Sequence, residues 1–351
     1  MKIKPMTKFA ILALSLVLVA CAGGGSEEAG CPAIDGREIN VVATTPMIGE
    51  FVSQVGGENI NLTVLMPPEA NPHTYEPAPQ DAGTIAEADL VFYTGLLYEP
   101  AALVKLLENS ACSTDILSEV GESVFPIEFK EGGHDDHDDH DDEEGHDDHD
   151  DEEGHDDEEG HDDEEGHDDH EGHNHGAYDP HFWFDPSRVA YAAEYIESRL
   201  IQFDPENESS YKSSADSFVS ELNDLTKQVS ELISTVPSQN RKLITTHESL
   251  GYLEAKFGLE VLSTIIPSLN SANEISPSDL AGVIDVIEDN NVKVIFIESE
   301  APSVYSETIV AETGIKPVTG LYVETLKPGQ SYSEFLISNV KLITENLQAT
   351  D

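Results

Sequence analysis

A long acidic tract limits where this chain can fold. Between Glu131 and Gly176 the sequence has no Val, Ile, Leu or Phe and repeats a unit close to Gly-His-Asp-Asp-Glu-Glu. A segment without apolar side chains cannot bury enough surface to offset the entropy lost when a chain becomes ordered. We therefore expect residues 131–176 to be a disordered loop, and the folded structure to come from the chain on either side of it.

The segments on both sides of the tract alternate strand and helix patterns, which is typical of a parallel sheet covered by helices. Before the tract we expect strands at 38–43, 61–66, 89–94 and 115–117 and helices at 46–55, 78–86 and 99–109. After it we expect strands at 242–246, 260–265, 292–298 and 316–318, and helices at 187–203, 206–234, 250–257, 278–290, 304–313 and 333–347. The fold class is therefore α/β, with two lobes that each contain a parallel sheet flanked by helices.

One predicted helix is long enough to join the two lobes. Residues 206–234 carry apolar side chains at spacings of three or four, and a helix of this length spans on the order of 43 Å. The expected organisation is a signal peptide at 1–20, a tether at 21–36, an N-terminal lobe at 37–186, a helical segment at 187–235 and a C-terminal lobe at 236–351.

The start of the chain has the pattern of an exported lipoprotein. Lys2, Lys4 and Lys8 precede an apolar run at 9–20, which is too short to span a bilayer but suits a signal peptide. The run ends in Leu-Val-Ala before Cys21, the pattern of a bacterial lipobox. We expect Cys21 to carry lipid and the protein to be anchored to a membrane outside the cytoplasm; the alternative is an ordinary cleaved signal with an incidental cysteine.

The other two cysteines, Cys31 and Cys112, are the natural disulfide pair, because disulfides persist outside the cytoplasm. The alternative of two free thiols stays open, since bridging requires their backbones to lie close together.

The charge distribution excludes one class of partner. The formal net charge is −53; the tract has 26 acidic residues and no Lys or Arg, and elsewhere acids outnumber bases by 44 to 17. Such a surface repels nucleic acid phosphates, whose binding requires Lys and Arg, but concentrates cations.

The histidines predict a metal site. Eleven of the 14 histidines lie in the tract, and the other three are His73, His181 and His247. His73 and His247 follow predicted strands, and the carboxyl ends of parallel strands form the crevice where ligands bind. Imidazole suits zinc, copper, nickel and cobalt, so we expect the three to bind one ion; the alternative is three unrelated polar histidines. For the tract we expect weak capture of several ions, against the alternative of a solvated spacer.

Four motifs around these residues resemble those of one protein family. They are Asn-Pro-His-Thr-Tyr-Glu-Pro at 71–77, Asp-Pro-His-Phe-Trp-Phe-Asp-Pro at 179–186, Thr-His-Glu-Ser-Leu-Gly-Tyr at 246–252 and Gly-Leu-Tyr-Val-Glu-Thr-Leu at 320–326. Their order is that of the zinc and manganese solute-binding proteins of ABC transporters, the ZnuA-like group. The resemblance covers nearly all of residues 37–349 and implies two lobes joined by a rigid helix, with a metal site between them.

The resemblance also implies a function and a set of ligands. It implies delivery of Zn²⁺ to the membrane permease of an ABC importer by a protein that is not an enzyme, and we expect a monomer. His73, His181 and His247 match the three histidine positions of zinc members, whereas manganese members usually have Glu where this chain has His247. The fourth position is normally Asp and here is Glu324, which leaves open whether it binds the ion directly, through water or not at all.

Two aspartates near the second motif have alternative roles. Asp179 or Asp185 can accept the second ring N–H of a ligating histidine, as metal-bound imidazoles usually require, or can cap the helix that starts near Ser187.

Two rival functions have sequence support. A zinc hydrolase also uses three histidines, and His247 with Glu248 begins an H-E-x-x-H pattern, but position 251 is Gly, so the second histidine of that motif is missing. A surface metal buffer or adhesin would use the tract as its functional part. Manganese or another divalent metal is the alternative cargo.

Overall fold

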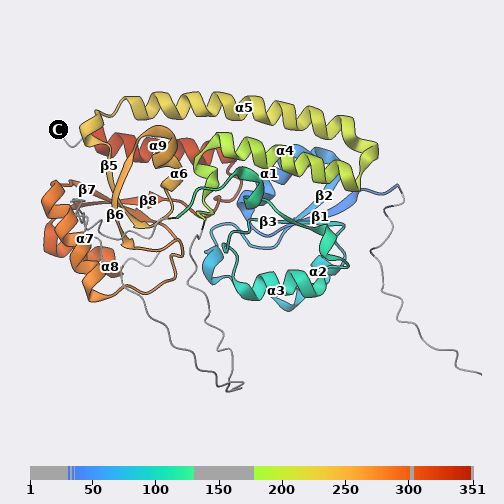
Figure 1. The fold of residues 1–351 in the computed structure, drawn as a ribbon, viewed down its shortest axis with the longest axis horizontal. Helices are drawn as coiled ribbons and strands as arrows, with labels where there is room; N and C mark the ends of the chain where they lie inside the picture. Colours follow the sequence, from blue (N-terminus) through green and yellow to red (C-terminus); the bar gives the residue numbers. More distant parts are fainter. Residues whose placement is uncertain (1–30, 32–33, 35, 130–177, 301–303, 349–351) are drawn as a thin grey trace, which may run out of the picture.

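The computed structural model describes residues 31, 34, 36–129, 178–300 and 304–348 (Figure 1). The expected signal peptide, Cys21, most of the expected tether and the acidic tract lie outside the described residues. Within them, the expected α/β class with parallel sheets flanked by helices is confirmed.

The N-terminal lobe, which we define as β1–β4 with α1–α3, contains one parallel sheet in the order β2-β1-β3-β4. The central strand β1 pairs on both edges, so that Val41 lies beside Leu62 on one side and Leu90 on the other. Thr45 caps α1 by accepting a hydrogen bond from the Ile48 N–H, and Pro at the first position suits a helix start. The elements are β1 (Ile39–Ala43), α1 (Pro46–Gly56), β2 (Ile60–Val64), α2 (Pro79–Ala86), β3 (Leu90–Tyr93), α3 (Ala101–Ser110) and β4 (Leu117–Glu119).

The C-terminal lobe, defined as β5–β8 with α6–α9, contains two parallel strand pairs, β5-β6 and β7-β8, where the sequence predicts one sheet. Strands β5 and β7 are neighbours, but side chains link their carboxyl ends. Thr246 Oγ1 accepts a hydrogen bond from the Glu298 N–H, and Glu298 Oε1 accepts one from the His247 N–H. The elements are β5 (Lys242–His247), α6 (Gly251–Phe257), β6 (Glu260–Ile266), α7 (Pro277–Asn290), β7 (Val294–Glu298), α8 (Val304–Thr313), β8 (Lys316–Leu321) and α9 (Tyr332–Gln348).

Two helices that separate the lobes in the sequence pack along one side of the molecule. These are α4 (Pro186–Phe203) and α5 (Glu208–Ser234). Helix α5 contacts α4, and it also contacts α1 of the N-terminal lobe and α6 and α9 of the C-terminal lobe (Figure 1). Its apolar side chains at helical spacing, among them Phe218, Leu222 and Leu225, are buried in the largest hydrophobic cluster, which includes residues of both lobes. Among the helices of the described residues, none combines the length and the apolar character needed to cross a bilayer.

The strand predicted at 115–117 is wrong by about two residues. A 3₁₀ turn covers Thr114–Ile116, because Ser113 Oγ accepts a hydrogen bond from the Asp115 N–H and starts the turn. The strand β4 follows this turn.

A disulfide fastens the start of the described chain to the N-terminal lobe. It joins Cys31 to Cys112, which lies just after α3, and their Cα atoms are 5.0 Å apart. Further along, the Arg37 guanidinium donates hydrogen bonds to both carboxylate oxygens of Asp89, each at 2.6 Å. The chain is thus held at two points before β1 begins.

Candidate metal centre

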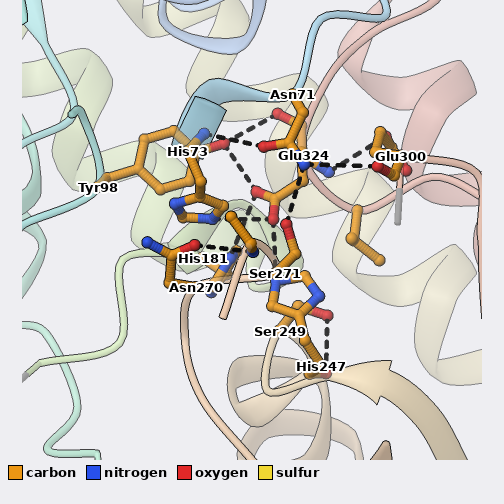
Figure 2. A network of polar contacts seen from close by, with 12 residues as sticks. Asn71, His73, Tyr98, His181, His247, Ser249, Asn270, Ser271, Glu300 and Glu324 are labelled. Carbon is orange, nitrogen blue, oxygen red and sulfur yellow. Dashed lines mark hydrogen bonds and ion pairs between the residues drawn. The ribbon is translucent and has the colours of Figure 1, made fainter. Parts of the chain in front are cut away.

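Four side chains from different parts of the sequence meet between the two lobes (Figure 2). His73 lies in a short 3₁₀ helix (Pro72–Thr74) after β2, and His181 immediately precedes another (Phe182–Phe184). His247 is the last residue of β5, and Glu324 follows β8. The structure therefore brings all four expected ligand residues to one place, near the carboxyl ends of strands.

The geometry of this group fits one ion. One ligand atom from each residue lies within 4.8 Å of all the others, and the four side chains are at most 2% exposed. A tetrahedral zinc site with bonds of about 2.0 Å has ligand atoms about 3.3 Å apart. A small contraction of the site would thus complete the coordination shell.

The surroundings of two ring nitrogens also fit a bound cation. Nε2 of His247 lies 2.9 Å from Glu324 Oε1, and Nε2 of His181 lies 3.4 Å from Glu324 Oε2. Neither nitrogen has a well-directed hydrogen bond to any of the described residues, although both are buried. Buried polar atoms are normally satisfied, so a ligand that accepts lone pairs explains their positions.

His73 and His181 are presented by the same local turn, an Asx residue, a proline and the histidine. Asn71 Oδ1 accepts a hydrogen bond from the His73 N–H at 2.9 Å, and Asp179 Oδ1 accepts one from the His181 N–H at 2.8 Å. Such side-chain turns are typical of Asn and Asp. The sequence thereby fixes the backbone at two of the histidines.

Two carboxylates fix the orientation of histidine rings. Each contacts Nδ1 of one ring, so that Nε2 of that ring faces the site. Asp179 Oδ1 lies 2.8 Å from Nδ1 of His181, and Glu298 Oε2 lies 2.5 Å from Nδ1 of His247. A carboxylate that accepts the Nδ1 proton leaves Nε2 as the ligand atom. Asp185 instead caps α4, where its Oδ1 accepts a hydrogen bond from the Ser187 N–H.

Glu324 is held by a hydroxyl of the other lobe. The Tyr98 hydroxyl, from the loop after β3, lies 2.9 Å from Oε2 and 3.0 Å from the carbonyl oxygen of Glu324, and donates to one of them. The remaining oxygen, Oε1, faces His73 at 3.0 Å and His247. One carboxylate therefore contacts both lobes.

The pKa values follow from this crowding of charges. Burial alone would lower the pKa of His181, but the carboxylates of Glu324 and Asp179 outweigh it and raise the pKa to about 9. For His247, burial would again lower the pKa, but the carboxylates of Glu298 and Glu324 outweigh it and raise the pKa well above its usual value. Burial would raise the pKa of Glu324, but the three histidines hold it well below its usual range.

Sequence reasoning did not identify Glu298 and Tyr98 as residues of the site. Glu298 ends the clear strand pattern of 292–298 with a buried carboxylate, which is an unusual residue for a strand interior. Its contact with His247 depends on the neighbouring positions of β5 and β7, which the sequence does not show.

Gly251 explains why the H-E-x-x-H pattern is incomplete. A Cβ atom at this position would lie 2.7 Å from Asp179 Oδ2, the carboxylate that orients His181. The space that a second histidine of that motif would need is therefore occupied.

Known proteins that match nearly the whole chain are named for metal binding or metal uptake. The manganese ABC transporter substrate-binding lipoprotein PsaA of Streptococcus anginosus is 25% identical over 98% of this chain and 99% of its own length. The high-affinity zinc uptake system protein ZnuA of Bacillus subtilis is 27% identical over 97% of this chain and 96% of its own length.

A solved structure has the same fold. The periplasmic zinc-binding protein TroA of Treponema pallidum superimposes with a TM-score of 0.69 at 20% identity, over 88% of this chain and 99% of that one. A family model described as zinc-uptake complex component A, periplasmic, matches residues 41–346. The chain therefore belongs to the ZnuA family of metal-binding components of ABC transporters.

Proposed function

We propose that this protein binds Zn²⁺ outside the cytoplasm and delivers it to the membrane permease of an ABC importer. As a member of its family it is a metal-binding transport component and not an enzyme. Several relatives are named as lipoproteins, which supports the lipid anchor at Cys21 and a position at the outer face of a membrane.

The donor set carries the choice of zinc. Three imidazole nitrogens and one carboxylate suit zinc, whereas manganese favours sites with more oxygen ligands. The carboxylates of Asp179 and Glu298 favour coordination through the histidines, because both contact the rings at Nδ1 and leave Nε2 for the ion. His73, His181, His247 and Glu324 would then be the four protein ligands.

Manganese is the competing cargo, because relatives of similar identity are named for manganese as well as zinc. Purification without an affinity tag, followed by elemental analysis, identifies the metal carried from the cell. Competition between Zn²⁺ and Mn²⁺ for the metal-free protein then gives the preference. Retention of manganese in the presence of equimolar zinc would overturn the zinc assignment and leave the transport function intact.

Metal affinity should rise with pH across the range from about 6.5 to 9. The raised pKa values mean that His181 and His247 are protonated in the metal-free protein at neutral pH, and a protonated imidazole cannot bind an ion. For each proton that the ion must displace, the metal affinity falls about tenfold for every pH unit below the pKa of that histidine. Chelator competition at pH 6.5, 7.5 and 8.5 measures the slope.

Proton release provides an independent check of this pH dependence. Calorimetry at pH 7.5 in buffers with different ionisation heats should show at least one proton released per ion. An affinity that stayed constant between pH 6.5 and 8.5, with no proton released, would contradict the prediction.

Replacing Glu298 by glutamine should weaken zinc binding about 10- to 100-fold, the usual effect of losing a carboxylate that orients a ligating histidine. Glu298 accepts from both the N–H and Nδ1 of His247, and an amide must turn its NH₂ group toward one of them. Calorimetry with a competing chelator measures the change.

Glu248→Gln is the matched control, because it removes the same charge next to His247 from a side chain whose Oε1 accepts a hydrogen bond from the Thr264 hydroxyl. Equal losses in the two variants would show that total charge, and not the contact with His247, is responsible.

A further inference from the structure

Asn71 makes contacts in both lobes. In the N-terminal lobe its Oδ1 accepts the hydrogen bond from the His73 N–H. Its Nδ2 donates to Ser271 Oγ at 3.1 Å and to the carbonyl oxygen of Glu300 at 3.4 Å, both in the C-terminal lobe (Figure 2). One side chain therefore holds the backbone of a ligand histidine and crosses between the lobes.

The partners of Asn71 lie on the loops that carry the other half of the site. Ser271 is buried in the loop after β6, and this loop is tied to the residue after His247 by the hydrogen bond from the Glu248 N–H to the Ser268 carbonyl. Glu300 follows β7, and its Oε1 accepts a hydrogen bond from the Glu324 N–H at 3.4 Å. The amide of Asn71 thus contacts segments next to both ligands of the C-terminal lobe.

The amide is needed for this double role. At the equivalent position of the second Asx-Pro-His turn the chain has Asp179, whose carboxylate accepts from the backbone and from the ring of His181. A carboxylate only accepts hydrogen bonds, whereas an asparagine side chain offers one acceptor and two donors. An aspartate at position 71 could hold His73 and accept a hydrogen bond from the Ser271 hydroxyl, but it could not donate to the Glu300 carbonyl oxygen.

We propose that Asn71 is a positioning residue that latches the two lobes together across the site and sets the rate at which the ion leaves. The proposal rests on the metal-binding function proposed above. Separation of the lobes must break the contacts of Asn71 with Ser271 and Glu300, so these contacts slow the opening step. In the metal-free protein the contacts form and break while the lobes open and close, and an ion can enter whenever they are broken, whereas a bound ion leaves only after they break; the contacts therefore act more on dissociation than on association.

Two variants isolate the contacts between the lobes. Asn71→Asp keeps the acceptor for the His73 N–H but turns an oxygen toward the Glu300 carbonyl, and Ser271→Ala removes the acceptor while Asn71 and His73 stay paired. Asn270→Asp is the charge control on the same loop, because an aspartate there still accepts from the Ala272 N–H, as Asn270 does.

The test measures zinc dissociation by stopped flow into excess chelator, together with the association rate and the thermal stability of the metal-free protein. We expect dissociation about five- to tenfold faster in Ser271→Ala, the effect of one lost buried hydrogen bond, and at least as fast in Asn71→Asp. The association rate should change less than about twofold, and the melting temperature of the metal-free protein should change by no more than a few degrees.

Unchanged dissociation in both variants would overturn the latch, and so would equal acceleration in Asn270→Asp. A wild-type protein that bound no zinc would instead refute the proposed function. The latch would then be decided by hydrogen exchange of the metal-free protein at 268–273, where faster exchange in Asn71→Asp supports it and unchanged exchange rejects it.

Discussion

Replacing His247 by alanine is expected to lower zinc affinity more than a hundredfold. Sites with four protein ligands bind zinc with apparent free energies of about 10–16 kcal/mol, so one ligand contributes about 3 kcal/mol. The substitution also leaves the buried carboxylate of Glu298 without the ring that it contacts. His181→Ala should have a similar effect, because His181 is equally buried and contacts both Asp179 and Glu324. Calorimetry with a competing chelator measures both affinities.

Deletion of residues 132–175 is the control for the two alanine variants. It removes eleven histidines but none of the four residues of the site, so one tight zinc ion per chain should remain while weakly bound ions are lost. Tight binding that survived His247→Ala and vanished with the deletion would place the receptor in the acidic tract instead.

Loss of the disulfide between Cys31 and Cys112 should lower the free energy of unfolding by about 2–4 kcal/mol. The bond closes a loop with a sequence separation of 81 residues, and cross-links across long loops remove the most conformational freedom from the unfolded chain. The double variant Cys31→Ser, Cys112→Ser should therefore unfold at a lower urea concentration than the wild type.

Two further measurements serve as controls for this prediction. Thiol titration of the oxidised, denatured protein should find neither cysteine free in the wild type, and zinc affinity should be unchanged in the double variant, because neither cysteine is among the ligand residues. Equal urea midpoints for the two proteins would show that the bond does not stabilise the fold.

The lobes were predictable from the sequence because local patterns determine their elements. Helix α8 covers the predicted residues 304–313, and strand β7 ends at Glu298 as predicted, although it begins at Val294, two residues after the predicted start. The division of the second sheet was not predictable. It depends on Thr246 and Glu298 forming side-chain bonds between β5 and β7, and a contact over 52 residues leaves no local pattern.

The candidate site divides in the same way. The positions of His73 and His247 after strands indicate a shared crevice, and the four motifs identify Glu324. The residues that act on these side chains were missed, because each comes from a different loop: Tyr98 contacts Glu324 over a separation of 226 residues, and Asn71 contacts Ser271 over 200. Such pairs result from the packing of the two lobes, and the hydrophobic periodicity of the sequence does not show which residues will meet.

The disulfide also determines how far the receptor can travel from its anchor. If Cys21 carries lipid, nine residues lie between it and Cys31, and the ten Cα–Cα steps that join the two can span at most about 36 Å. Without the bond, the chain would first be held at Arg37, and the sixteen Cα–Cα steps from Cys21 reach about 58 Å. The volume open to the point where the folded domain is attached grows as the cube of this reach, so attachment at Cys31 instead of Arg37 makes that volume about four times smaller. The bond would thereby raise the effective concentration of the domain at a permease in the same membrane.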